Sequence, residues 1–192
     1  IKNECKEVYW EKVEKINRAP KQDHPAFYLL SGLPGSGKTT VLRKKLKVDV
    51  DENIFILDPD EFRERMPSYE KLMRRYKVDD NTFVIPETYP NDDTFTKQFA
   101  KIHKLSQECC IGGRNEESDY KGNQTVDWLG SQPQPTLLDH AFDQKIHFAY
   151  DALNDELLKF NRFTHLNRAQ DYNYDAVHIW ILYNSLPTII EN

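Results

Sequence analysis

An apolar segment, Phe27–Leu30, runs directly into the pattern Gly-x-x-x-x-Gly-Lys-Thr. Glycines at this spacing let the backbone turn so that several N–H groups point toward one anion. The lysine supplies a positive charge for the outer phosphates of a nucleotide, and the threonine hydroxyl can ligate Mg²⁺. A strand before the loop and apolar residues near helical spacing after it, Val41, Leu42 and Leu46, are the context that this motif requires. The predicted nucleotide-binding residues are Gly32, Leu33, Pro34, Gly35, Ser36, Gly37, Lys38, Thr39 and Thr40.

Two carboxylates follow the next apolar segment. Asn53–Leu57 suits a strand that is covered on both faces, and Pro59 ends it between Asp58 and Asp60. The carboxyl ends of parallel strands form the ligand-binding edge of an open α/β sheet. We therefore expect both carboxylates to face the outer phosphate of the nucleotide. The alternative is that they only complement the dipole of the helix that follows.

Two enzyme classes fit this arrangement. In an ATPase or GTPase, Asp58 would hold Mg²⁺ and Glu61 would lie near the attacking water. In a small-molecule kinase, an acid after the second strand orients and deprotonates the acceptor hydroxyl. Asp58 follows Lys38 by 20 residues, which places it in the very next strand, and the sequence has no base-reading Asn-Lys-x-Asp motif. This spacing favours the kinase.

The remaining elements follow from hydrophobic periodicity. Lys2–Arg18 is expected to be an amphipathic helix that buries Tyr9, Val13 and Ile16. Further predicted elements are a short strand at Thr82–Ile85, a helix at Thr94–Ser106, a polar loop at Gln107–Pro135, a helix at Thr136–Phe160 and a strand at Ala176–Tyr183. Together they predict an α/β fold, a P-loop nucleotide-kinase-like open parallel sheet with helices on both faces and a long polar insertion.

This order divides the chain into two expected parts. Residues 1–26 form an N-terminal helix and linker, and residues 27–192 form the kinase-like domain, with the insertion at about 78–135.

Composition and charge narrow the function classes. The 192 residues carry 26 basic and 31 acidic side chains, a formal net charge of −5, and no basic stripe, which disfavours nucleic acid as a partner. Three cysteines, Cys5, Cys109 and Cys110, form no disulfide framework and indicate reduced thiols. No apolar run is long enough to span a membrane. A cytoplasmic protein is expected; a delivered effector, or a targeting segment before Ile1, stays open.

Two segments resemble the zeta toxin family. The first is the phosphate loop Gly32–Thr39, and the second is the more specific run Asp58-Pro59-Asp60-Glu61-Phe62-Arg63 followed by Met66–Leu72 and Tyr76. The likeness covers about residues 27–76, and residues 177–190 more loosely. Members of this family are P-loop kinases, and characterised bacterial members phosphorylate UDP-N-acetylglucosamine on its sugar. The resemblance implies ATP or GTP with Mg²⁺ as cofactors, a hydroxyl-bearing small molecule as acceptor, and a protein antitoxin or host protein as partner.

The resemblance also implies roles for single residues. Lys38 would stabilise the transferring phosphate, Thr39 would bind Mg²⁺, and Asp60 would be the base on the acceptor hydroxyl. Asp58 would be a secondary candidate, on the metal or in shaping the loop.

The chain departs from the family pattern in two places. The family has a further strand before the last one that ends in an acid-Gly-Thr-like turn, but here Lys159–His165 stands in that region and Thr164 alone would represent the turn. The family also supplies lid arginines from the helix after the last strand, and this chain ends at Asn192, so that lid region is expected to be missing. The nearest substitutes are Arg162 and Arg168.

Three functions remain in view. The first is an ATP/Mg²⁺-dependent phosphotransferase that acts on a small-molecule hydroxyl such as that of a nucleotide sugar. The second is a polynucleotide-end kinase, for which the arginines at 63, 65, 74 and 75 would have to line a groove, although they alternate with glutamates as on a solvated helix. The third is a non-catalytic nucleotide-binding effector or interaction module whose insertion binds a partner.

Overall fold

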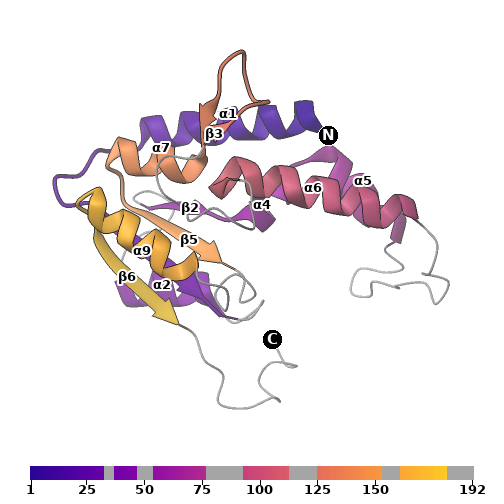
Figure 1. Cartoon of the computed structure of the whole chain (residues 1–192). Helices are drawn as coiled ribbons and strands as arrows, with labels where there is room; N and C mark the ends of the chain where they lie inside the picture. The colour runs from indigo at the N-terminus through magenta and orange to yellow at the C-terminus, as the bar shows by residue number, and fades with distance from the viewer. Residues whose placement is uncertain (33–36, 47–53, 77–92, 113–124, 153–160, 181–192) are drawn as a thin grey trace, which may run out of the picture.

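A computed structural model of the chain describes residues 1–32, 37–46, 54–76, 93–112, 125–152 and 161–180. Along the chain the elements are α1 (Lys2–Arg18), β1 (Ala26–Ser31), α2 (Lys38–Leu46), β2 (Phe55–Leu57), α4 (Pro59–Glu64), α5 (Pro67–Tyr76), α6 (Asp93–Ile111), β3 (Thr125–Val126), β4 (Gln134–Pro135), α7 (Leu137–Gln144), β5 (Phe148–Ala152), α9 (Asn161–Asp171) and β6 (Asp175–Trp180). Figure 1 shows their arrangement.

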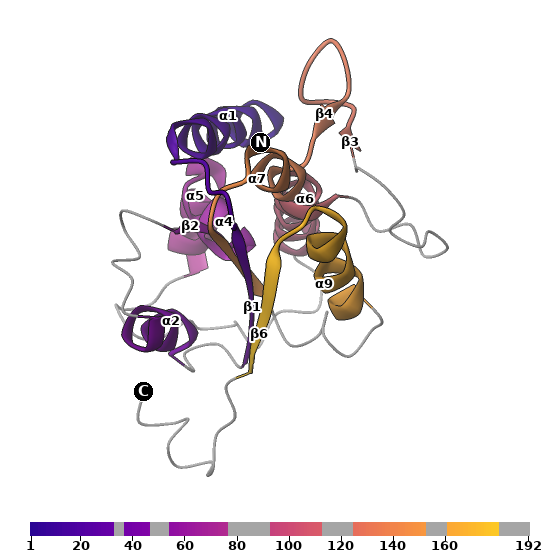
Figure 2. The same ribbon diagram turned by 90° about the vertical axis from the view of Figure 1, so that its left-hand side faces the viewer.

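The central sheet is parallel, with the strand order β2-β5-β1-β6. β1 lies inside the sheet, where Leu29 pairs with Tyr150 of β5 and with His178 of β6. Helix α2 lies on one face of the sheet and α9 on the other (Figure 2). The predicted α/β fold, an open parallel sheet with helices on both faces, is confirmed.

Side chains alternate between the two faces of β1. Phe27 and Leu29 join the larger core, where the ring of Phe27 contacts those of Phe142 (5.5 Å between centroids) and Phe148 (4.9 Å). Leu30 joins a smaller cluster with Leu42 of α2. Burial on both faces explains why this segment reads as a continuous apolar run rather than as an alternating one.

Helix α1 packs on the core as its periodicity predicts. Tyr9, Val13 and Ile16 are buried, and the Tyr9 hydroxyl donates to the carbonyl of Pro135 (2.7 Å). Cys5 on the same helix is a free, buried thiol, as are the two cysteines of α6, and burial raises the pKa of Cys5 to about 12. Thiols held protonated in this way are unreactive.

The predicted helix at Thr136–Phe160 is wrong. α7 ends at Gln144, because Lys145 takes a left-handed conformation (φ +55°) and its N–H bonds to the carbonyl of Phe142. The chain then enters β5, a strand whose apolar residues also fit helical spacing and which was therefore predicted as part of the helix. Elsewhere the predicted helix at Thr94–Ser106 is confirmed as the longer α6. The strands predicted at residues 53–57 and 176–183 are confirmed over their described parts, as β2 and β6.

The predicted strand at Thr82–Ile85 lies outside the described residues. Over the parts of the chain that the structure describes, we find no helix with both the length and the apolar character to cross a lipid bilayer.

Candidate active site at the carboxyl edge of the sheet

The described end of the turn between β1 and α2 has one feature of an anion cradle. Gly37 has a φ of +76°, where a side chain would be strained, although a Cβ there would meet Thr40 only at an ordinary 3.9 Å. The Gly37 carbonyl accepts from the N–H of Val41 (2.9 Å), which opens α2. The N–H groups before the first helical bond have no acceptor within a helix and favour an anion. The residues of the loop itself, 33–36, lie outside the described part of the chain.

Lys38 begins α2 and turns its ammonium toward the sheet. Its Nζ donates to the carbonyl of Gly32 (3.2 Å) and pairs with Oδ1 of Asp151 (3.3 Å) at the end of β5. The side chain of Lys38 is 9% exposed and that of Asp151 is 16% exposed. Because β5 pairs with β1, this contact lies where the phosphate loop leaves the sheet.

Three carboxylates share the electrostatic field at this edge. The pKa of Asp151 is raised to about 6, chiefly by burial and also by the charges of Asp58 and Asp60, while Lys38 acts to lower it. Burial also raises the pKa of Asp58, although bonds from backbone N–H groups oppose that rise. Asp58 and Asp60 therefore lie close enough to Asp151 for their charges to oppose its ionisation. We call these three residues and Lys38 the carboxyl-edge site.

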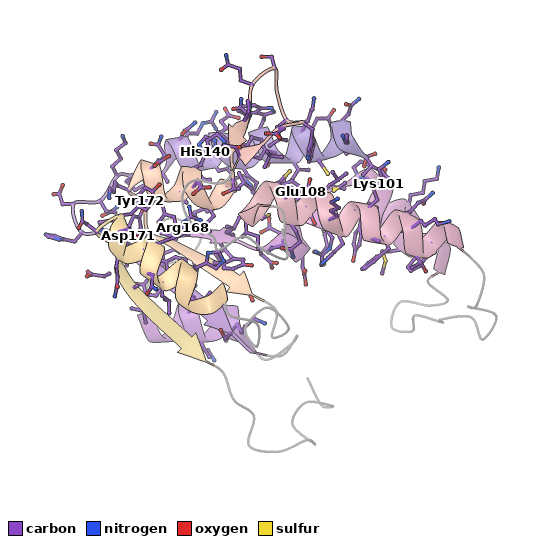
Figure 3. The ribbon with its side chains drawn as sticks, in the orientation of Figure 1. Lys101, Glu108, His140, Arg168, Asp171 and Tyr172 are labelled. Atoms are coloured by element: carbon purple, nitrogen blue, oxygen red, sulfur yellow. The ribbon has the colours of Figure 1, made fainter. Side chains whose placement is uncertain are left out.

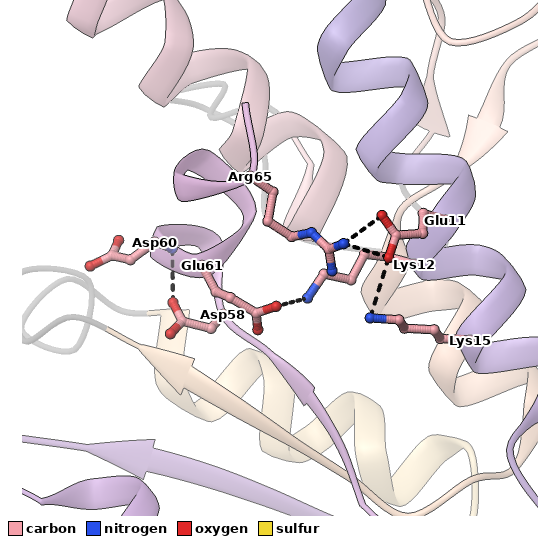
Figure 4. A network of polar contacts seen from close by, with 7 residues as sticks. All are labelled: Glu11, Lys12, Lys15, Asp58, Asp60, Glu61 and Arg65. Carbon is pink, nitrogen blue, oxygen red and sulfur yellow. Dashed lines mark hydrogen bonds and ion pairs between the residues drawn. The ribbon is translucent and has the colours of Figure 1, made fainter. Parts of the chain in front are cut away.

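Asp58 and Asp60 are held by the start of α4. Asp58 is the N-cap, and its Oδ1 accepts from the N–H of Asp60 (2.8 Å), while Pro59 occupies the first helical position. The carboxylate of Asp60 pairs with Arg63, whose Nη1 donates to Nδ1 of His103 on α6 (3.1 Å). Figure 4 shows the carboxylates of Asp58 and Asp60 pointing away from α1. The order acid-Pro-acid thus ends β2, caps α4 and places both carboxylates at the sheet edge.

The structure brings together three of the residues singled out from the sequence, Lys38, Asp58 and Asp60. Thr39 lies in the first turn of α2, but its side chain is outside the described part, as are those of Arg162 and Thr164 at the start of α9.

Arg168 is not at this site, so its prediction as a lid residue is corrected. It lies in the last turn of α9, before the amino end of β6, whereas the phosphate loop follows the carboxyl end of β1. Its guanidinium is buried and pairs with Asp139 of α7. Figure 3 shows Arg168 on α9 near Tyr172. Tertiary packing with a residue 29 positions away, which periodicity does not reveal, gives this arginine a structural partner.

Asp151 is the site residue that sequence reasoning missed. It lies near the carboxyl end of β5, the strand that precedes β6 among the described elements. Thr164, the residue expected to represent that turn, lies in the first turn of α9. The signal was an aromatic-rich run, Phe148–Tyr150, that ends in an acid.

The carboxylates alone do not make a metal site. Within the described residues, no group of three or more His, Cys, Asp or Glu side chains is arranged to hold a metal ion. An ion here would need ligands from outside that set, such as the Thr39 hydroxyl or phosphate oxygens, which is the usual situation of Mg²⁺.

Comparison with known proteins gives one family. Residues 11–89 match the family described as "Zeta toxin". The chain is similar to Toxin zeta of Streptococcus pyogenes (31% identical over 95 residues, 50% of this chain and 31% of that protein). It is also similar to Toxin zeta of Enterococcus hirae (34% over 86 residues, 45% and 28%) and to Toxin PezT of Streptococcus pneumoniae serotype 4 (36% over 78 residues, 40% and 30%).

A solved structure has the same fold. The match is to a chain from the PezAT chromosomal toxin-antitoxin system of Streptococcus pneumoniae, with a TM-score of 0.56 and 16% identity, and it covers 93% of this chain and 55% of that chain. The chain thus spans about half of that solved chain, and its matched segments span less than a third of these curated relatives.

Proposed function

We propose, from the similarity of this chain to the zeta toxin family, that it transfers the γ-phosphate of ATP or GTP to a hydroxyl of a small molecule. One observation carries the proposal. The ammonium of Lys38 lies 3.3 Å from Asp151 at the edge of the sheet where Asp58 and Asp60 also gather. A cation that begins a helix, beside carboxylates that can take a proton, is what phosphoryl transfer to an alcohol requires.

The residues present fit a magnesium nucleotide. The turn around Gly37 and the N–H groups that open α2 would hold the phosphates, and Lys38 would contact the outer ones. Thr39 and Asp58 are the proposed Mg²⁺-binding residues. When bound, the magnesium nucleotide supplies the phosphoryl group, and its ion offsets part of the negative charge at this edge. Among the described residues, the cations that pair with these three carboxylates are Lys38 and Arg63, so a divalent cation suits the local balance.

Asp60 is the proposed general base. Arg63 holds its carboxylate, and the N-cap of Asp58 holds its backbone, so the carboxylate has a fixed direction before any acceptor arrives. A base with a fixed direction orients an acceptor hydroxyl and takes its proton as the bond to phosphorus forms. Asp151 is proposed to face the acceptor from the neighbouring strand.

A nucleotide sugar such as UDP-N-acetylglucosamine is the proposed acceptor, and a protein antitoxin the proposed partner, both by analogy with the family. A polynucleotide end is less favoured, since the three nearby arginines whose side chains the structure describes already have partners. Arg63 pairs with Asp60, Arg65 with Glu11 and Arg74 with Glu70. Arginines that neutralise carboxylates do not form the basic groove that a nucleic acid needs.

The test is incubation of the purified chain with γ-labelled ATP or GTP and Mg²⁺ in three parallel reactions. One contains UDP-N-acetylglucosamine, one a 5′-hydroxyl oligonucleotide and one no acceptor. Label on the sugar supports the proposal, and label on the oligonucleotide would instead favour the polynucleotide kinase. Nucleotide binding without transfer to either acceptor would leave a nucleotide-binding module.

A further inference from the structure

The helix that carries the proposed base is short. α4 has six residues, fewer than two turns, and a helix of that length is unstable without tertiary contacts. Asp60 lies in its first turn. The direction of the Asp60 carboxylate therefore depends on what holds this turn against the rest of the molecule.

Lys12 of α1 is one of the residues that fix the first turn of α4. It is buried, with 4% of its surface exposed, and its Nζ lies 2.6 Å from Oε1 of Glu61, the residue after Asp60. The same ammonium lies over the ring of Phe55 in β2, 6.0 Å from the centroid. Lys12 thus contacts both β2, the strand that precedes Asp58 and Asp60, and the first turn of α4, in which Asp60 lies. A buried ammonium is costly to leave without a partner, so this pairing is strongly enforced.

The position of Lys12 is itself fixed. Its neighbours along α1, Tyr9, Val13 and Ile16, are buried in the core, so the helix cannot rotate to move the ammonium. The Glu61 carboxylate is 43% exposed and would be free to turn toward solvent without this partner. Lys12 is therefore the rigid member of the pair and Glu61 the member that is held.

Holding Glu61 sets the direction of Asp60. Successive residues of a helix project about 100° apart around its axis. Figure 4 shows the Glu61 carboxylate directed toward α1 and the Asp60 carboxylate directed the opposite way, away from α1. If Glu61 is pinned to α1, the first turn of α4 cannot rotate, and Asp60 stays at the sheet edge beside Asp151.

We propose that Lys12 is a positioning residue for Asp60, acting through Glu61, and that α1 is thereby a part of the catalytic unit. This inference rests on the proposed function, in which Asp60 is the general base. It gives the N-terminal helix a role in the reaction beyond its packing on the core.

The molecule offers a matched control between the same two helices. Glu11 of α1 pairs with Arg65 (2.6 Å) and with Lys15 (3.3 Å), and all three side chains are at least 35% exposed. Arg65 is the C-cap of α4, at the opposite end from Asp60 (Figure 4). Glu11→Gln therefore loosens α4 at the far end from the proposed base.

The experiment compares Lys12→Met with Glu11→Gln in the purified chain. Methionine fills the buried site without a charge and leaves a half-exposed Glu61, so the variant is expected to fold, and Lys12→Leu is a second variant of the same kind. We expect Lys12→Met to lower kcat about 10- to 100-fold, since a misplacement of about 1 Å costs that much, with nucleotide Kd unchanged within about twofold. Glu11→Gln should change neither quantity by more than about twofold, and Lys12→Arg should restore most of the rate.

A second readout needs no turnover. The ¹³Cγ carboxylate signal of Asp60, assigned by its loss in Asp60→Asn, should move in Lys12→Met and stay in place in Glu11→Gln. An unmoved signal in Lys12→Met would overturn the proposal, as would a wild-type kcat per folded molecule. If the wild-type chain transfers phosphate to no acceptor, the proposed function fails, whereas the carboxylate signal still decides whether Lys12 positions Asp60.

Discussion

Two buried ion pairs in this molecule have different surroundings. At the carboxyl-edge site, Lys38 pairs with Asp151, and both side chains keep some exposure, 9% and 16%. On the helices beside the sheet, Arg168 pairs with Asp139, which has no exposure at all. Thr136 completes this second group by donating to Oδ2 of Asp139 (2.6 Å) and accepting from its N–H (3.1 Å). We call Thr136, Asp139 and Arg168 the Asp139 cluster.

The difference lies in the charge around each pair. In the Asp139 cluster one guanidinium meets one carboxylate, and a hydroxyl fills the carboxylate's other oxygen. At the carboxyl-edge site, the charges of Asp58 and Asp60 also act on Asp151 and help to raise its pKa. Removing one partner of a buried, neutral pair destabilises a fold, while a partly exposed pair with surplus negative charge is where a cation and a substrate can act.

The largest expected effect is a loss of stability when the ion pair between Arg168 and Asp139 is broken. Arg168→Met would leave Asp139 charged without its guanidinium in a fully buried position, and we expect a loss of about 3–5 kcal/mol in the free energy of unfolding. Denaturant unfolding measures it. Transfer per folded molecule should stay near the wild-type value. Lost transfer at unchanged stability would contradict the comparison and make Arg168 a lid residue after all.

The second largest effect is a loss of phosphate transfer when the ion pair between Lys38 and Asp151 is broken. Lys38→Met should lower kcat/KM for transfer about 10²- to 10³-fold, the usual cost of removing a group that stabilises transition-state charge. Its effect on the free energy of unfolding should be smaller than that of Arg168→Met, because Asp151 can take up a proton or reach water. Steady-state kinetics and denaturant unfolding of both variants test the contrast. The contrast between the two pairs is contradicted if Lys38→Met lowers the free energy of unfolding as much as Arg168→Met does.

The third effect concerns pH. Burial raises the pKa of Asp151 from 3.8 to about 6, so the folded state favours the protonated acid. Its contribution to stability is therefore fully present below about pH 3.8 and is lost as the pH rises through about 6. Asp151→Asn mimics the protonated form. The unfolding free energy of this variant, relative to wild type, should rise by about 1–3 kcal/mol between pH 4 and pH 7. A pH-independent difference would mean that Asp151 ionises normally.

The smallest expected effect on stability comes from breaking an ion pair that is exposed to solvent. Glu70 and Arg74 of α5 form an ion pair with side chains 56% and 76% exposed. Arg74→Ala should cost less than about 0.5 kcal/mol, since water screens the charges. Thermal unfolding at two salt concentrations provides the measurement. A cost similar to that of Arg168→Met would show that burial is not what separates these pairs.

Much of the architecture could be predicted from the sequence because local signals agree with the fold. The glycine pattern, the strand before it and the spacing after it all locate the β1–α2 turn, and Pro59 marks where β2 becomes α4. The amphipathic pattern of α1 identifies Tyr9, Val13 and Ile16 as buried. In each case, one short segment contains the whole signal.

The parts that failed depend on contacts between distant segments. The apolar residues of β5 fall at positions that also fit a helix continuing from α7, and a lysine rather than glycine or proline makes the break at residue 145. Asp151 was missed with that strand. Arg168 looks solvated in its own helix, and only packing against α7 shows that Asp139 lies opposite. Lys12 is hidden in the same way, since its partner is 49 residues away.

The most direct test of the central claim is single-turnover transfer of labelled γ-phosphate by Asp60→Asn at saturating nucleotide, beside a measurement of nucleotide Kd. The account predicts that the variant binds nucleotide as the wild type does and transfers phosphate about 10²- to 10⁴-fold more slowly, the range lost with a general base. Transfer at the wild-type rate would contradict it, because the carboxyl-edge site would then have no need of the carboxylate at its centre.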